Sequence, residues 1–220
     1  MPRRSASFFK PKPPMKNQKA LLLTALILAL ISAPASGKTT RYAAQGRNAE
    51  PYSHDYVKLD GVQFLRNASD DGDSFHVRAK GREHIFRLYF VDTPETDNSF
   101  PERVAEQAAY FGITPADAIR VGKLAEAFTI KQLAGHPFTV FTRWMDAKGR
   151  SRLERFYAHI FTGDKNLAEL LVSNGLARLH GVHANLPDGT HAAVFEKRLL
   201  AMEQKAKSEK LGAWGLRGRK

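Results

Sequence analysis

The chain has 220 residues, of which 34 are Lys or Arg and 22 are Asp or Glu, so its formal net charge is +12. Its 43% hydrophobic and 25% charged residues are close to a globular average and argue against a wholly disordered, collagenous or polytopic membrane protein. The absence of cysteine excludes disulfides, thiolate nucleophiles and Cys-ligated metal sites, and the positive charge favours an anionic partner.

The N-terminal segment has the form of an export signal. Six Lys and Arg and no acid precede an apolar run from Ala20 to Ile31. As a helix this run would span about 18 Å, which is short of a bilayer core of roughly 30 Å. Ala33 and Ala35 then give the small-x-small pattern of a signal-peptidase site. We predict a signal peptide over residues 1–35, cleavage after Ala35, and a secreted or periplasmic protein without a stable membrane span; the alternative is an uncleaved interfacial anchor.

Much of the positive charge lies outside the predicted domain. Residues 1–35 hold six bases and no acid, so their removal leaves a net charge of +6. Residues 196–220 carry eight bases and three acids, which leaves the part between nearly neutral. A basic C-terminal helix is more often a solvated face than a binding surface, so bulk charge is a weak argument for a nucleic-acid partner. The functional argument depends on local motifs.

The first half of the chain predicts a linker and then a β-meander. Residues 36–56 are polar and lack a sustained period, which indicates a flexible linker before a domain over residues 57–214. Three short β-rich runs then follow: 62–65, 74–78 and 84–91. Between the last two runs, Lys80-Gly81-Arg82 suits a hairpin turn.

The second half predicts mixed helices and strands. Thr114 to Asp117 offers Thr as N-cap, Pro at the first helical position and an acid in the first turn, so a helix is expected from there to Gly135. Two strands, a short helix and a longer helix are then expected in this order: 138–143, 156–161, 166–174 and 190–211. Residues 215–220 are expected to form a basic tail after the domain.

The side chains suited to catalysis lie between residues 71 and 95. Asp71-Gly72-Asp73 precedes one strand and residues 92–95 (Asp-Thr-Pro-Glu) end the next, with Arg87 between them. A hairpin would bring the two acidic turns together. Carboxylates at one point repel one another and favour a hard cation such as Ca²⁺ or Mg²⁺, bound by carboxylate and backbone oxygens. Each turn alone is explained as well by a structural role, but the combination indicates a site.

These stretches resemble the two signature sequences of the staphylococcal nuclease (thermonuclease) family. The resemblance implies an α+β, mainly β fold, namely an OB-fold barrel of five strands with three helices. It also implies a Ca²⁺-dependent endonuclease, a phosphodiester hydrolase that acts on DNA and RNA and leaves 3′-phosphate ends. The similarity extends over roughly residues 57–214, and the stretches that carry it are 71–74, 86–96, 155–161, 167–177, 190–191 and 210–214.

The resemblance further implies roles for individual residues. Glu95 matches the general base, and Arg87 and Arg155 match the arginines that hold the scissile phosphate. The chemistry of these residue types agrees, because guanidinium groups stabilise charge on phosphoryl oxygens and a carboxylate one water away can accept a proton. The positions that match the family's metal ligands are two acids and a backbone carbonyl: Asp73, Asp92 and Thr93.

The sequence departs from the family pattern before the fifth strand. The family has Tyr-Gly-Arg there, whereas Lys148-Gly149-Arg150 and Arg155 compete here for the role of second arginine. We favour Arg155, because an ungapped alignment supports it and Arg150 would need an insertion. Arg150 remains a candidate for substrate binding.

Two further stretches differ from the family. At residues 179–183 the family places tyrosines that stack on nucleotide; His183 could replace one of them by stacking, whereas Gly181 cannot. The segment over residues 97–114 is longer than usual and has no assigned role.

Three other interpretations remain at this point. Imidazoles bind zinc, so His180, His183 and His191 could form a zinc site, although they match no known ligand spacing. A non-catalytic OB-fold protein could bind nucleic acid without cutting it, but it would not need the acids and arginines together. An exported structural protein would explain the leader only. We therefore expect an exported monomer that hydrolyses DNA or RNA.

Overall fold

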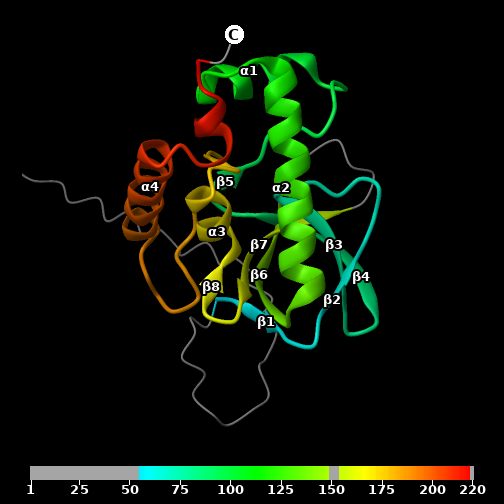
Figure 1. Cartoon of the computed structure of the whole chain (residues 1–220). Coiled ribbons are helices and arrows are strands. Elements are labelled where there is room, and N and C mark those ends of the chain that lie inside the picture. Colours follow the sequence, from blue (N-terminus) through cyan, green and yellow to red (C-terminus); the bar gives the residue numbers. More distant parts are fainter. Residues whose placement is uncertain (1–54, 149–153, 219–220) are drawn as a thin grey trace, which may run out of the picture. The chain divides into compact units, whose positions relative to one another are not determined.

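The structure is a computed structural model that describes residues 55–148 and 154–218 (Figure 1). The predicted signal peptide, nearly all of the predicted linker and Arg150 lie outside the described residues. Tyr56, at the end of the predicted linker, is buried and donates a hydrogen bond of 2.6 Å to the carbonyl oxygen of Asn185. No helix in the described ranges is both long enough and apolar enough to span a membrane.

A mixed β-sheet forms the centre of the described part. Its strands are β1 (Val57–Leu59), β2 (Gln63–Leu65), β3 (Ser74–Ala79), β4 (Arg82–Leu88), β6 (Phe138–Asp146), β7 (Arg155–Thr162) and β8 (Lys165–Asn166). The hydrogen-bonded order is β1-β6-β7-β4-β3-β2, with β8 paired to β7. All pairs are antiparallel except β4 with β7, which is parallel. A separate two-stranded sheet pairs β5 (Val91–Asp92) with β9 (Arg178–Leu179).

The expected five-stranded barrel is not confirmed. The strand order begins at β1 and ends at β2, and no pairing joins these two strands within the described residues. The described ranges also contain four α-helices rather than three. The architecture is thus a mostly β, α+β fold without a closed barrel.

The predicted hairpin between β3 and β4 is confirmed. Ser74 pairs with Arg87, and Lys80 and Gly81 at the tip have φ of +50° and +76°, as in the turns that match strand twist. The predicted run 84–91 is not one strand, however. Phe90 has φ of +71°, and the chain then leaves the large sheet to form β5. This break directs the residues after it toward β9.

The described residues also form four α-helices: α1 (Pro101–Phe111), α2 (Pro115–Gly135), α3 (Leu167–Ser173) and α4 (Ala192–Ser208). A 3₁₀ turn, η1 (Gly212–Leu216), follows α4. The predicted start of α2 is confirmed, since the Thr114 side chain accepts a hydrogen bond from the Asp117 backbone N–H. The helix α1, which the sequence analysis did not predict, begins with Pro101 and ends at Gly112 in the left-handed region.

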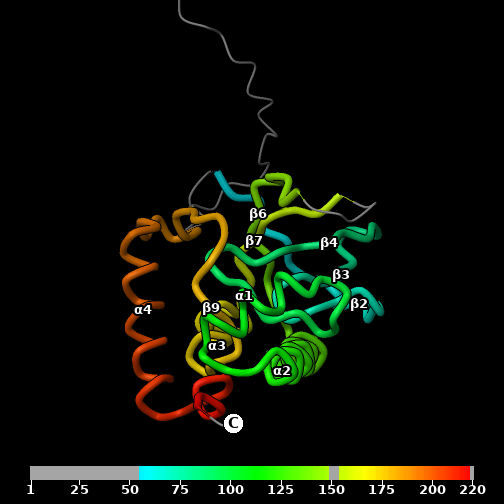
Figure 2. The backbone as a smooth tube through the Cα atoms, turned by 90° about the horizontal axis from the view of Figure 1, so that it is seen from above, coloured from blue at the N-terminus to red at the C-terminus, as the bar shows by residue number. Residues whose placement is uncertain are grey.

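The helices α2 and α3 both contact the sheet and also contact each other. The helix α2 contacts β2, whereas α3 contacts β7 and α4 (Figures 1 and 2). The helix α1 packs on α2 through a small apolar cluster of Val104, Ala108 and Ala118. This packing places α1 next to the turn that follows β5.

Candidate active site

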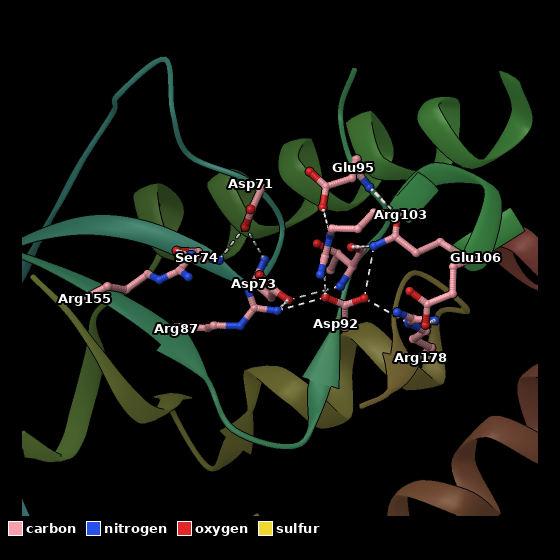
Figure 3. Close-up of polar contacts among 12 residues, drawn as sticks. Asp71, Asp73, Ser74, Arg87, Asp92, Glu95, Arg103, Glu106, Arg155 and Arg178 are labelled. Carbon is pink, nitrogen blue, oxygen red and sulfur yellow. Dashed lines mark hydrogen bonds and ion pairs between the residues drawn. The ribbon is translucent and has the colours of Figure 1, made fainter. Parts of the chain in front are cut away.

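Two acidic turns and one arginine meet at the end of the hairpin (Figure 3). Arg87 Nη2 on β4 lies 3.1 Å from Asp73 Oδ2 and 2.8 Å from Asp92 Oδ1. The backbone N–H of Thr93 donates to Asp73 Oδ2 at 3.2 Å. The register of β3 and β4 explains this meeting, because Ser74 pairs with Arg87 and so sets Asp73 beside the end of β4. The structure thus brings the two predicted acidic turns together.

Asp71 shapes the first turn. Its Oδ1 accepts hydrogen bonds from the backbone N–H groups of Asp73, at 3.0 Å, and Ser74, at 2.6 Å. Burial and the nearby Asp73 carboxylate raise the pKa of Asp71 well above its usual range. Burial also raises the pKa of Asp73, although Arg87 opposes this. A buried acid beside a partly buried one is a setting that a bound cation stabilises.

Asp92 is the centre of the site. It is only 1% exposed, and its Oδ1 accepts from Arg87 and from Arg103 Nη2 at 2.9 Å. Its Oδ2 accepts from Arg178 Nε at 2.9 Å and from Gln107 Nε2 at 3.0 Å. Burial alone would raise the pKa of Asp92, but Arg103, Gln107 and the other two arginines hold it below its ordinary value. This carboxylate is therefore ionised.

Glu95 lies at the more exposed edge of the site. Its backbone N–H donates to Gln107 Oε1 at 2.9 Å, and its Oε1 is 2.5 Å from Arg103 Nε. The helix α2 packs against its turn at Gly122, where a Cβ atom would lie 2.5 Å from the Pro94 carbonyl oxygen and closer still to that of Glu95. The carboxylate is thus held near Asp92 with 22% of the side chain exposed.

Arg155 borders the same site from β7. Its Nη1 donates to Ser74 Oγ at 3.4 Å, and its Nη2 donates to the carbonyl oxygen of Lys148 at 2.7 Å. Its Nε is buried and has no hydrogen-bond partner in the part of the chain that the structure describes. Arg155 therefore lies next to the turn that carries Asp73. Since Arg150 is outside the described residues, the choice between the two arginines stays a prediction.

His183 contacts groups outside the cluster of Asp73, Asp92 and Glu95. His183 stacks on Phe90, with ring centroids 4.5 Å apart and an interplanar angle of 18°, and its Nδ1 is 3.5 Å from Glu196. Within residues 55–148 and 154–218, no group of three or more His, Asp or Glu side chains is placed to hold a metal ion. The proposed zinc site at His180, His183 and His191 thus gains no support from the geometry.

Four side chains of the site were missed by the sequence analysis: Arg103, Glu106, Gln107 and Arg178. The first three lie on one face of α1, and Arg178 Nη1 is 3.0 Å from Glu106 Oε1. The signal for α1 was present in the sequence, because Pro101 and Gly112 are typical of a helix start and end. No local signal predicts Arg178, since its partner Asp92 is 86 residues away.

The oxygen atoms of the site fit a hard divalent cation. The candidate ligands are two carboxylates and a backbone carbonyl, which are the donors that Ca²⁺ prefers. Thr93 Oγ1 is also buried in this region without a hydrogen-bond partner among the described residues. In the present arrangement the same oxygens accept hydrogen bonds: Arg87 bridges Asp73 and Asp92, and Gln107 Nε2 donates to the Thr93 carbonyl at 3.1 Å.

Comparison with known proteins finds a family model that matches this chain and several proteins of similar sequence. A family model described as staphylococcal nuclease homologue matches residues 85–215. Endonuclease YncB of Bacillus subtilis (strain 168) is 29% identical over 172 residues, which are 76% of this chain and 68% of YncB. The SPbeta prophage-derived endonuclease YokF of the same organism is 30% identical over 152 residues, 67% of this chain and 42% of YokF. An uncharacterized Bacillus anthracis protein is 26% identical over 164 residues, 73% of this chain and 66% of that protein. The chain thus spans less than half of YokF and about two thirds of the other two.

Proposed function

Because the chain belongs to the staphylococcal nuclease homologue family, we propose that it is an exported, monomeric endonuclease that hydrolyses DNA or RNA with the help of Ca²⁺. Family membership and two relatives named endonuclease support nuclease activity in general terms. The observation that carries the finer proposal is the cluster in which Arg87 bridges Asp73 and Asp92 beside Glu95.

In this proposal, Asp73, Asp92 and the carbonyl oxygen of Thr93 would hold the cation. When bound, Ca²⁺ would offset charge on the phosphoryl oxygens and polarise a water molecule. Asp92 is suited to this role because its lowered pKa keeps it ionised. The buried Asp73 is suited because a cation removes the repulsion between it and Asp71.

The remaining side chains would act on the phosphate and the water. Arg87 is charged at all working pH values, because Asp73 and Asp92 raise its pKa against the effect of burial. Its guanidinium and that of Arg155 would donate to the phosphoryl oxygens as negative charge develops. Glu95 would accept a proton from the attacking water while the bond from phosphorus to the 5′ oxygen breaks, and the leaving oxygen takes a proton from solvent. The product then carries a 3′-phosphate.

The test is cleavage of plasmid DNA and of RNA by the purified protein, with end analysis of the products. We expect cleavage that EGTA abolishes, that Ca²⁺ restores and that zinc does not restore, with 3′-phosphate ends. Nucleic acid that is bound but left intact in Ca²⁺ would instead support the non-catalytic binding protein. Activity restored by zinc alone would contradict the choice of metal.

We also propose that the protein is exported. The support is the sequence of residues 1–35, with its basic start, apolar run and small residues at Ala33 and Ala35. N-terminal sequencing of the exported protein should begin at Ser36. A mature protein that retains residues 1–35 would contradict cleavage and support the interfacial anchor.

A further inference from the structure

We propose that Arg103 is a positioning residue that holds the Glu95 carboxylate in place for hydrolysis, an inference that rests on the function proposed above. Its guanidinium bridges two acids, with Nε 2.5 Å from Glu95 Oε1 and Nη2 2.9 Å from Asp92 Oδ1 (Figure 3). Among the described residues, it is the cation that contacts the Glu95 carboxylate. One planar group thus fixes the distance between Glu95 and the central acid of the site.

The backbone of Glu95 is held by the same helix, α1. Gln107 lies one turn after Arg103 on α1 and is fully buried. Its Oε1 accepts from the Glu95 backbone N–H, and its Nε2 donates to Asp92 and to the Thr93 carbonyl oxygen. The helix α1 therefore holds both the backbone and the carboxylate of Glu95.

The helix is itself firmly anchored. Val104, Ala108 and Phe111 are buried beneath it, and Glu106 pairs with Arg178 from β9. The Arg103 side chain is 38% exposed, but Nε and Nη2 face the two carboxylates rather than solvent. This direction favours an action through Glu95 over a direct contact with the phosphate.

Positioning matters here because a glutamate side chain has several rotatable bonds. Without Arg103, the partly exposed carboxylate would sample positions from which it cannot reach the attacking water. A displacement of about 1 Å at a reacting group can cost about 100-fold in rate. We therefore expect loss of Arg103 to lower kcat far more than it changes the affinity for nucleic acid.

The test is a double-mutant cycle on the full protein in Ca²⁺, with a labelled oligonucleotide as substrate. We expect Arg103→Met to lower kcat about 10- to 100-fold and to change KM less than about 3-fold. In the Glu95→Gln background, where no base is left to position, Arg103→Met should change kcat less than about 2-fold. Oligonucleotide affinity, measured by fluorescence anisotropy, should be unchanged in all four proteins.

Arg120→Met is the matched control. Arg120 is an exposed arginine on α2 whose ion pair is with Asp117 rather than with Glu95 or Asp92, so its loss removes the same charge without removing a contact to Glu95. Its kcat should equal that of the wild type. If Arg103→Met fails to fold in a thermal melt, Arg103→Lys keeps the charge but lacks the rigid planar donors that hold the two acids in register, and it should lower kcat in the same Glu95-dependent way.

Three results would overturn the inference. An equal loss of kcat in the wild-type and Glu95→Gln backgrounds would show that Arg103 acts by a route other than Glu95, either on the phosphate or through Asp92. A gain in kcat would show that Arg103 blocks the site, and an unchanged kcat would show that it has no part in the reaction. A wild-type protein without Ca²⁺-dependent cleavage refutes the proposed function, whereas normal cleavage that depends on Glu95 but not on Arg103 refutes only this inference.

Discussion

The two ends of the site differ in how firmly the fold holds their carboxylates. Asp92 is 1% exposed and accepts hydrogen bonds from four donors, three of them arginines. Glu95 is 22% exposed at its side chain, and its carboxylate contacts Arg103. The buried end therefore contributes to the stability of the protein as well as to the site, while the exposed end contributes mainly to the reaction. Substitutions at the two ends should separate stability from activity.

The largest effect is expected from Asp92→Asn. It removes the buried counter-charge that three arginines share and leaves Arg87 with Asp73 and Arg178 with the exposed Glu106, so the free energy of unfolding should fall by about 3–5 kcal/mol. Urea denaturation followed by circular dichroism measures this, and cleavage should be lost as well. The control is Asp60→Asn, an exposed acid, which should change the free energy of unfolding by less than about 0.5 kcal/mol. Equal stability of the two variants would refute a structural role for Asp92.

Glu95→Gln should lower activity strongly and stability only slightly. Removal of the proton acceptor should lower kcat on the order of 10²–10⁴-fold. The partly exposed pair with Arg103 contributes little to folding, so the free energy of unfolding should change by less than about 1 kcal/mol. Single-turnover cleavage and urea denaturation of the same sample give both values. Near wild-type cleavage by this variant would remove Glu95 from the mechanism.

Gly122→Ala should lower both the stability of the protein and its kcat moderately. Its Cβ would overlap the carbonyl oxygens of Pro94 and Glu95, so α2 or the turn must move, at a cost of about 1–3 kcal/mol. We expect kcat to fall too, because the turn carries Glu95. Gly135→Ala on the same helix is the control, since nothing lies within 4 Å of its Cβ position. Equal behaviour of the two variants would show that the close approach of α2 does not position the turn.

The smallest effect is expected at His183, outside both ends of the site. One face of its ring is covered by Phe90, which leaves the other face for a nucleotide base. His183→Ala should weaken oligonucleotide binding about 5-fold, the lower end of the effect of a stacked base, and leave kcat unchanged. Fluorescence anisotropy measures this against His136→Ala, an exposed histidine after α2. An unchanged affinity would exclude stacking on His183.

The local signals in the sequence predicted the hairpin, the start of α2 and the meeting of the acidic turns. These features depend on neighbours along the chain, such as the Lys80-Gly81 turn and the Thr114 cap. The barrel, which the family resemblance implied, is not confirmed. The unbroken strand predicted over residues 84–91 is wrong, because the β-rich composition continues through Phe90 and cannot reveal that this residue adopts a left-handed conformation.

The site was predicted less completely than the fold around it. Asp73, Arg87, Asp92 and Glu95 were found because they lie in two short motifs. Arg103, Gln107 and Arg178 were missed because their roles come from packing: a helix face and a distant strand bring them to Asp92. Local pattern cannot specify such tertiary ion pairs.

The pairing of β5 with β9 has a consequence for the order of folding. It joins Asp92 to Arg178 across 86 residues of chain, so loop closure must precede completion of the site. In a nascent chain that ends before residue 178, Asp92 lacks one of the arginines that pair with it. Nuclease activity that depends on this site would thus be acquired only late in folding, after the C-terminal third of the chain has packed against the rest.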